Sequence, residues 1–301
     1  MQIDISVKNN VGFSNTAKLI LKIIISLACL MYVYYKLSWE TIVSVLYTTN
    51  WLWILAAIGI FIVSKILSAY RLHQFFSATG TKITHNNNIR LYWLGMFYNQ
   101  FLPGSISGDA FKVAYLFKKK LGTVKWLTWS ILLDRVSGVT ALTFIASIIW
   151  LCLFRLNVIS ILVLTVALSI IGIYFLVLHF FMNSFRLIKF DSFYWSIAVQ
   201  FLQMVCMFFI LNALGSNNIL QLLFIFSVAS IVAVLPLSIG GIGAREIVFL
   251  WGAHWLDIDA AAAVTAGFLF YLVNLLAALP GCYFIFSDPF KTTHEAVDAL
   301  V

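Results

Sequence analysis

The chain has 301 residues, of which 62% are hydrophobic and only 10% are charged. A soluble domain carries about 25% charged residues, because its surface must be hydrated. The composition therefore excludes a soluble enzyme, a disordered chain and a nucleic-acid-binding domain, and it indicates an all-α integral membrane protein. The 19 basic and 11 acidic side chains give a net charge of +8, which in a membrane protein mainly reports the orientation of the loops.

Six apolar stretches are long enough to span a bilayer as helices, since a span needs about 20 apolar residues. In chain order these predicted spans are 19–37, 51–70, 126–154, 158–181, 192–214 and 260–286. Two further apolar stretches, 89–117 and 219–250, are interrupted by Pro and Gly. Residues 1–17 form a polar N-terminal segment and 287–301 a short tail, so the membrane domain is expected over 18–286.

Basic residues concentrate in alternate loops. They precede the first predicted span, follow the second and surround the stretch 89–117, whereas the loop after 219–250 is acidic, with Asp257 and Asp259. Assigning the basic loops to the cytoplasm predicts a multi-pass protein of the cytoplasmic membrane with both termini inside. In this topology the stretch 89–117 enters and leaves on the cytoplasmic side as a re-entrant hairpin, and 219–250 does so on the outer side.

The two interrupted stretches share the pattern L-P-x-S-I-x-G, which begins at Leu102 and again at Leu235. The pattern divides the membrane domain into two repeats, about 18–155 and 156–286, each with three crossings, so the second repeat must be inverted. Broken helices in inverted repeats are typical of transporters, although a helix break that recurs for structural reasons alone is the simpler alternative. The residues expected to break the helices are Pro103, Gly104, Gly108, Pro236, Ser238, Gly240, Gly241 and Gly243.

Charged residues next to the breaks indicate a polar cavity, because ions inside a membrane are costly unless they are paired or functional. They are three acids and three bases, Asp109, Lys112, Asp134, Arg135, Arg245 and Glu246. They form either a neutral structural network or, together with Asn99, a site for a lipid headgroup. In the second interpretation the three bases contact a phosphate, and Asp109 or Asp134 pairs with Arg245. Lys65 is interpreted as reaching toward the interface, and Arg71 as a loop residue.

Three motifs resemble those of a known family, the transmembrane flippase domain of lysylphosphatidylglycerol synthases. They are Asn99-x-x-x-Pro103-Gly104-x-x-x-Gly108-Asp109-x-x-Lys112, Asp134-Arg135-x-x-Gly138 and Pro236-x-Ser238-x-Gly240-Gly241-x-Gly243-x-Arg245-Glu246. The chain departs from the family pattern at Ser107, where Gly is usual, and at Lys112, where Arg is common. The aminoacyl-transfer domain of the two-part members has no counterpart after 286. The resemblance therefore implies lipid translocation without lysyl-lipid synthesis.

The expected function is a lipid transporter, or flippase, that moves a polar, phosphate-bearing headgroup between the inverted repeats. Two alternatives stay open: a subunit that presents a lipid-linked sugar to a glycosyltransferase, and a membrane-embedded lipid-modifying transferase. The expected ligand is a phospholipid or a polyprenyl-phosphate-linked lipid. A second copy of the chain, a glycosyltransferase or a synthase is the expected protein partner. No catalytic constellation, cofactor motif or metal-ligand spacing is found in the sequence, so neither an enzyme nor a cofactor is expected.

Overall fold

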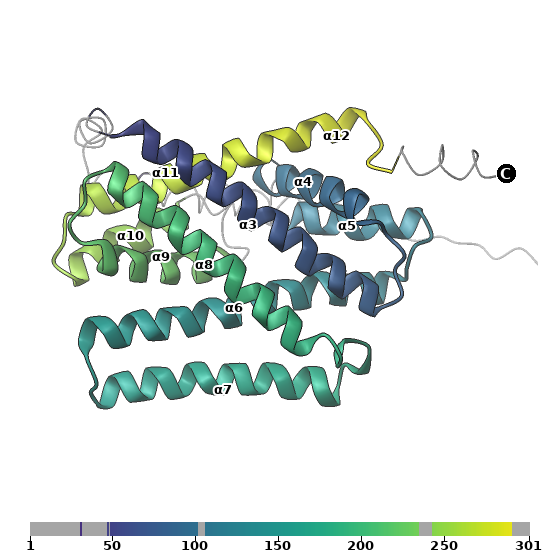
Figure 1. Ribbon diagram of the computed structural model, residues 1–301, viewed down its shortest axis with the longest axis horizontal. Coiled ribbons are helices and arrows are strands. Elements are labelled where there is room, and N and C mark those ends of the chain that lie inside the picture. Colours follow the sequence, from purple (N-terminus) through teal and green to yellow (C-terminus); the bar gives the residue numbers. More distant parts are fainter. Residues whose placement is uncertain (1–30, 32–46, 48, 102–105, 235–242, 291–301) are drawn as a thin grey trace, which may run out of the picture.

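A computed structural model describes residues 31, 47, 49–101, 106–234 and 243–290 of the chain, and every element among them is a helix. In chain order the elements are α3 (Trp51–Ala78), α4 (His85–Phe101), α5 (Ser107–Lys118), α6 (Val124–Phe154), α7 (Val158–Phe180), η1 (Asn183–Phe185), α8 (Lys189–Ala213), α9 (Ile219–Val234), α10 (Ala244–Trp255), α11 (Ala260–Ala278), η2 (Leu279–Cys282) and α12 (Tyr283–Phe286). The long helices lie side by side in a bundle (Figure 1).

Five helical segments in the described residues are long and apolar enough to cross a membrane: Trp51–Ala78, Val124–Phe154, Val158–Phe180, Lys189–Ala213 and Ala260–Phe286. They correspond to five of the six predicted spans, and the sixth, 19–37, lies outside the described residues. The polytopic all-α architecture is thus confirmed. One boundary was wrong, because α3 continues to Ala78 instead of ending near residue 70. Arg71 is therefore a buried helix residue and not a loop residue.

Side-chain caps fix the starts of three spanning helices. The side chains of Asn50, Asn157 and Asp259 accept hydrogen bonds from the backbone N–H groups of the first turns of α3, α7 and α11. Each cap satisfies a donor that has no carbonyl partner inside its helix. The Asn50 N–H also donates to the Ala213 carbonyl at 2.9 Å. This bond joins the start of α3 to the end of α8, and the two helices run antiparallel along most of their length (Figure 1).

Two helix pairs occupy the places of the predicted re-entrant hairpins. Helix α4 packs against α5, and α9 packs against α10. Helices α5 and α10 have 12 residues each, which is about 18 Å at 1.5 Å per residue and too short for a hydrocarbon core of about 30 Å. The pairs lie at opposite ends of the bundle (Figure 1). Pro103, Gly104, Pro236, Ser238, Gly240 and Gly241 lie outside the described residues.

Gly108 is one of the two predicted break residues that the structure describes, and it serves helix packing. A Cβ at Gly108 would lie 1.8 Å from the carbonyl oxygen of Gly95 on α4. Only glycine allows the backbones of α4 and α5 to approach this closely. The other described break residue is Gly243, which precedes α10 with a φ of +84°. This backbone conformation is in the left-handed region that favours glycine.

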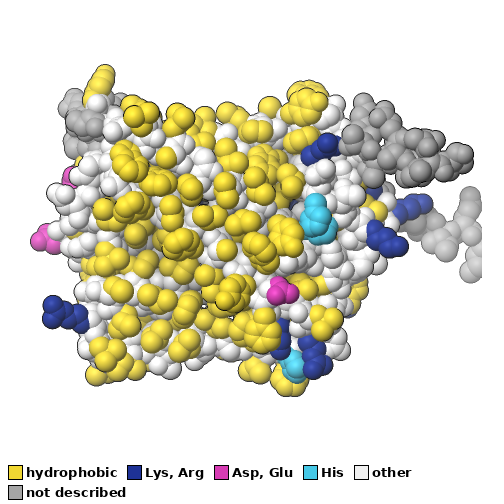
Figure 2. Space-filling view, viewed as in Figure 1, with side chains coloured by type: hydrophobic (Ala, Val, Ile, Leu, Met, Phe, Trp, Pro, Cys, Tyr) yellow, Lys and Arg dark blue, Asp and Glu magenta, His cyan; other side chains and the backbone are white. Residues whose placement is uncertain are grey.

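The outer surface of the bundle is apolar. Helix α7 leaves large side chains such as Val158, Leu162 and Ile173 exposed. Figure 2 shows hydrophobic side chains across the middle of one face, with most of the visible Lys, Arg and His side chains toward the right end. Such an apolar band is expected where a protein meets lipid.

A polar clamp outside the spanning helices joins the end of α5 to the residues after α12. The ammonium of Lys119 donates to the Asp288 carboxylate at 2.7 Å, and the hydroxyl of Tyr115 donates to the same carboxylate. Partial burial raises the pKa of Asp288, but these hydrogen bonds outweigh it and lower that pKa to about 2. Asp288 is therefore ionised at neutral pH, and the clamp is charged.

Candidate functional site

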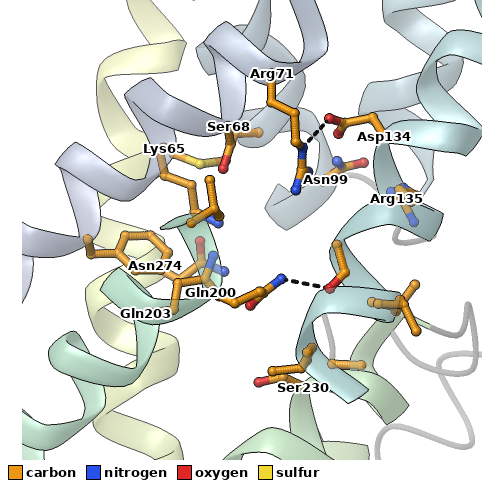
Figure 3. A pocket seen from close by; sticks show the side chains of 18 of the residues that line it. Lys65, Ser68, Arg71, Asn99, Asp134, Arg135, Gln200, Gln203, Ser230 and Asn274 are labelled. Atoms are coloured by element: carbon orange, nitrogen blue, oxygen red, sulfur yellow. Dashed lines mark hydrogen bonds and ion pairs between the residues drawn. The ribbon is translucent and has the colours of Figure 1, made fainter. Parts of the chain in front are cut away.

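A cavity of about 280 Å³ lies in the middle of the bundle. Its walls come from α3, α4, α5, α6, α8, α9, α10 and α11, so both helix pairs contribute. The lining is unusual for a membrane interior because it is rich in charged and amide side chains. Figure 3 shows several of them converging on the cavity from α3, α6 and α8.

Asp109, near the start of α5, is the centre of one group of charges. Its carboxylate accepts a hydrogen bond from Lys112 Nζ at 2.9 Å and another from Arg135 Nε at 2.5 Å. Lys112 also lies over the ring of Tyr92, 4.8 Å from its centroid. The structure thus brings together three residues predicted for the site, from two different helices.

Asn99 and Gly138 support this part of the cavity. The Asn99 side chain accepts a hydrogen bond from the Gly108 N–H at 2.8 Å, which holds the first turn of α5 against α4. A Cβ at Gly138 would lie 3.4 Å from the Gln200 amide and 3.5 Å from the Arg71 guanidinium. Gly138 therefore leaves room for a close approach, as its position one turn after Asp134 predicts.

Asp134 pairs with Arg71, a residue that the sequence analysis had placed in a loop. Arg71 Nε donates to Asp134 at 2.7 Å, and Arg71 Nη1 donates to the Ser196 hydroxyl on α8 at 2.9 Å. The buried ion pair joins α3 to α6 (Figure 3), and the hydrogen bond to Ser196 adds α8 to the connection.

Arg245 lines the cavity from α10 but does not form the predicted pair with Asp109 or Asp134, because those carboxylates bind other bases. Its guanidinium instead lies over the ring of Phe270, 5.1 Å from the centroid. Its Nε donor is buried and has no hydrogen-bond partner among the residues that the structure describes. Among the described residues Arg245 forms no ion pair.

Glu246 was predicted to bind a headgroup, but the structure gives it another task. Its carboxylate accepts a hydrogen bond from the Gly243 N–H at 2.7 Å and so caps the first turn of α10. The negative charge of this carboxylate is also attracted to the positive end of the helix dipole, which stabilises the start of α10. Glu246 does not contribute to the cavity wall.

Several cavity residues were missed or given another role. Lys65, Ser68 and Arg71 all point into the cavity from α3 (Figure 3). Their spacing of three residues places them on one face of the helix, and this spacing was the available signal. The other polar lining residues outside the prediction are Gln100, Gln200, Gln203, Ser230 and Asn274. Of these, Gln200 joins two helices, since its amide donates to the Gly138 carbonyl at 3.2 Å.

Acids and bases contribute unequally to the described cavity wall. Two acids line it, Asp109 and Asp134. Five bases line it: Lys65, Arg71, Lys112, Arg135 and Arg245. The lining side chains thus carry an excess of three positive charges, which the buried carboxylate of Glu246, next to Arg245, reduces to two. Such an excess attracts an anion. No group of three or more His, Cys, Asp or Glu side chains that could hold a metal occurs among the described residues.

The comparisons with known proteins agree with this architecture. No curated protein matches the chain. The family model described as the lysylphosphatidylglycerol synthase transmembrane region matches residues 19–281, which include all the cavity residues and both helix pairs. The chain therefore belongs to the family of the lysylphosphatidylglycerol synthase transmembrane region.

Proposed function

We propose that the protein is a lipid transporter that moves a phosphate-bearing headgroup through the central cavity while the acyl chains stay in the bilayer. The observation that carries this proposal is the excess of positive charge on a buried wall built by eight helices. A purely structural network would be expected to neutralise itself, since an uncompensated buried charge is costly. A phosphate group in the cavity would supply the missing negative charge.

The arrangement of the two helix pairs supports alternating access. Helices α4 and α5 approach the cavity from one end of the bundle and α9 and α10 from the other (Figure 1). In the proposed orientation the basic end, which carries Lys118, Lys119 and Lys120, is cytoplasmic. The two halves of the chain are then inverted repeats, and the cavity opens to either side as one pair moves against the rest.

The proposal is tested with the purified protein alone in liposomes. The lipids are acyl-labelled phosphatidic acid, phosphatidylglycerol and phosphatidylcholine, and their movement is measured by chemical quenching of the outer leaflet. We expect at least one of them to equilibrate faster with protein than in empty liposomes. Arg245→Lys and Arg245→Ala should both lose this activity, because lysine keeps the charge but not the planar fork that binds phosphate through two hydrogen bonds.

Thermal stability is measured in parallel, and Arg155→Ala, which removes an exposed base outside the cavity, is the matched control. Normal transport by Arg245→Lys would assign Arg245 a structural role. If the folded protein moves none of the three lipids, this result contradicts the proposed transport function. A requirement for an added glycosyltransferase would instead indicate a presenting subunit, and chemically altered lipid would indicate a transferase.

A further inference from the structure

Both carboxylates in the described cavity wall are already engaged. Asp109 binds Lys112 and Arg135, and Asp134 binds Arg71. Neither acid forms an ion pair with Lys65 or Arg245 in the part of the chain that the structure describes. The described wall of the cavity therefore offers no uncommitted carboxylate to a cationic group such as the amine of an aminoacylated lipid.

Lys65 and Arg245 rest on two aromatic rings that contact each other. Lys65 Nζ lies 4.5 Å from the centroid of Phe61, and Arg245 Cζ lies 5.1 Å from that of Phe270. The two rings meet edge to face with their centroids 5.5 Å apart. This aromatic shelf, Phe61 and Phe270, orients both cations and stabilises them by cation–π contact without neutralising their charge.

Unpartnered polar atoms accompany the two cations. Only 7% of Arg245 is exposed, and its Nε donor has no partner in the described part of the chain. The Ser230 hydroxyl and the Asn274 carbonyl oxygen, which belong to the same cavity, are also buried and form no hydrogen bond with another described residue. Figure 3 shows Lys65 extending from α3 toward Gln203 and Asn274. Buried polar groups without partners are rare in native proteins, and here they surround a space that a ligand can enter.

We infer that Lys65 and Arg245 form a binding site for a phosphate group with at least two negative charges, such as a phosphomonoester or a diphosphate. The inference rests on the proposed function and narrows its substrate class from any phosphate-bearing lipid to lipids with a polyanionic headgroup. A zwitterionic headgroup brings no net charge and leaves the excess of positive charge in place. A cationic headgroup increases that excess. A diphosphate offsets most of it and accepts hydrogen bonds from both bases at once.

Binding of soluble anions to the intact protein in detergent tests the site without any variant. Inorganic pyrophosphate and glycerophosphocholine, a zwitterionic phosphodiester, are titrated by calorimetry at constant ionic strength. We expect pyrophosphate to bind at least about tenfold more tightly, since each charge-assisted hydrogen bond contributes about 1.4 kcal/mol or more. Equal affinities for the two compounds would overturn the inference.

Single variants then locate the site. Lys65→Gln and Arg245→Gln should each weaken pyrophosphate binding by about tenfold, whereas Lys125→Gln, which removes an exposed base from the start of α6, should not change it. If either cavity variant fails to fold, Lys65→Arg or Arg245→Lys takes its place. Lys65→Arg should keep the preference for pyrophosphate over glycerophosphocholine, whereas Arg245→Lys, which lacks the planar fork, should weaken pyrophosphate binding, and unchanged binding by Arg245→Lys would overturn the role of Arg245. Equal weakening by Lys125→Gln would mean that the general surface charge binds the anion, and it would overturn the site.

Transport assays separate this inference from the proposed function. If phosphatidylcholine moves as fast as phosphatidic acid, the polyanion inference is wrong and the transporter stands. If pyrophosphate binds through Lys65 and Arg245 but no lipid moves, the inferred phosphate site is supported with a soluble anion as its ligand. The proposed transport function is then wrong. Preferred movement of phosphatidic acid, lost in Arg245→Gln, supports both.

Discussion

At the scale of single residues, the ion pair between Arg71 and Asp134 fixes the orientation of two charged side chains in the cavity wall. Both side chains are buried, and the pair is reinforced by the hydrogen bond from Arg71 to Ser196. Asp109 has the same role for Lys112 and Arg135. The two acids thereby hold three bases in fixed orientations, whereas Lys65 and Arg245 form no ion pair in the described part of the chain and are the bases that we propose to bind the phosphate.

We predict that Asp134→Asn destabilises the protein by about 3 kcal/mol, because removing one partner leaves the Arg71 charge buried and unpaired. The measurement is equilibrium unfolding in mixed detergent micelles. The double variant Arg71→Leu/Asp134→Leu should be less destabilised than Asp134→Asn, since it leaves no unpaired charge. Unchanged stability of Asp134→Asn would show that water or another group compensates Arg71.

Most charged site residues could be predicted from the sequence, but their pairing could not. Asp109, Lys112, Asp134, Arg135 and Arg245 all line the cavity, because ionic side chains in an apolar stretch have few other places to lie. Pairing depends on how distant helices pack. Arg71 and Asp134 are 63 residues apart, and no local spacing relates them. Lys65 and Arg71 were missed because both lie close to residue 70, where the predicted span ended, although α3 continues to Ala78.

At the scale of the helices, the pair α4 and α5 depends on the contact between Gly95 and Gly108. The contact is backbone to backbone, so no side chain can move aside to admit an extra carbon. It also fixes the first turn of α5, where Asp109 and the Asn99 hydrogen bond lie. Helix packing and cavity chemistry are therefore coupled at one residue.

We predict that Gly108→Ala disrupts the pair, lowers the thermal unfolding temperature and abolishes transport, because the added Cβ would lie 1.8 Å from the Gly95 oxygen. Unfolding in detergent and transport in liposomes are the measurements. The control is Gly172→Ala on α7, where a Cβ meets no atom within 4 Å. That variant should be as stable as the original protein. A fully active Gly108→Ala would show that α4 and α5 can separate without loss of function.

The helix breaks were predictable because Pro and Gly in an apolar stretch disfavour a continuous helix. The capping role of Glu246 was harder to predict. Its spacing of three residues from Gly243 fits a helix cap, yet the same residue also fits a charged site. The geometry of the first turn of α10 decides between these roles, and that geometry depends on the positive φ of Gly243.

At the scale of the whole molecule, charge is distributed unevenly between the two ends of the bundle. The end that holds the loops after α3, α5 and α7 carries Lys82, Lys119 and Arg186, whereas the opposite end carries Asp257 and Asp259. This asymmetry follows from the sequence alone once the helices are placed. Composition alone does not fix the number of membrane crossings. An apolar stretch interrupted by Pro and Gly has the length of a spanning helix, and only the structure shows that its second helix, α5 or α10, has 12 residues and is too short to span.

We predict that single cysteines at Lys119 and Ser184 are protected from an impermeant thiol reagent added outside intact cells, whereas one at Asn217 is labelled. The physical reason is that basic loops stay on the cytoplasmic side. The background is a variant without the native cysteines, and permeabilised cells, in which all three positions should react, provide the control. Labelling of position 119 from outside would mean that the α4 and α5 pair crosses the membrane, and the inverted arrangement would then be wrong.

The clamp between Lys119, Tyr115 and Asp288 adds a charged contact to the packing of the Phe290 ring against Tyr115. Residues 169 positions apart in the chain are held together at the surface, and α5, which carries Tyr115, also carries the cavity residues Asp109 and Lys112. One helix of 12 residues therefore joins a surface contact near the end of the described chain to the wall of the cavity.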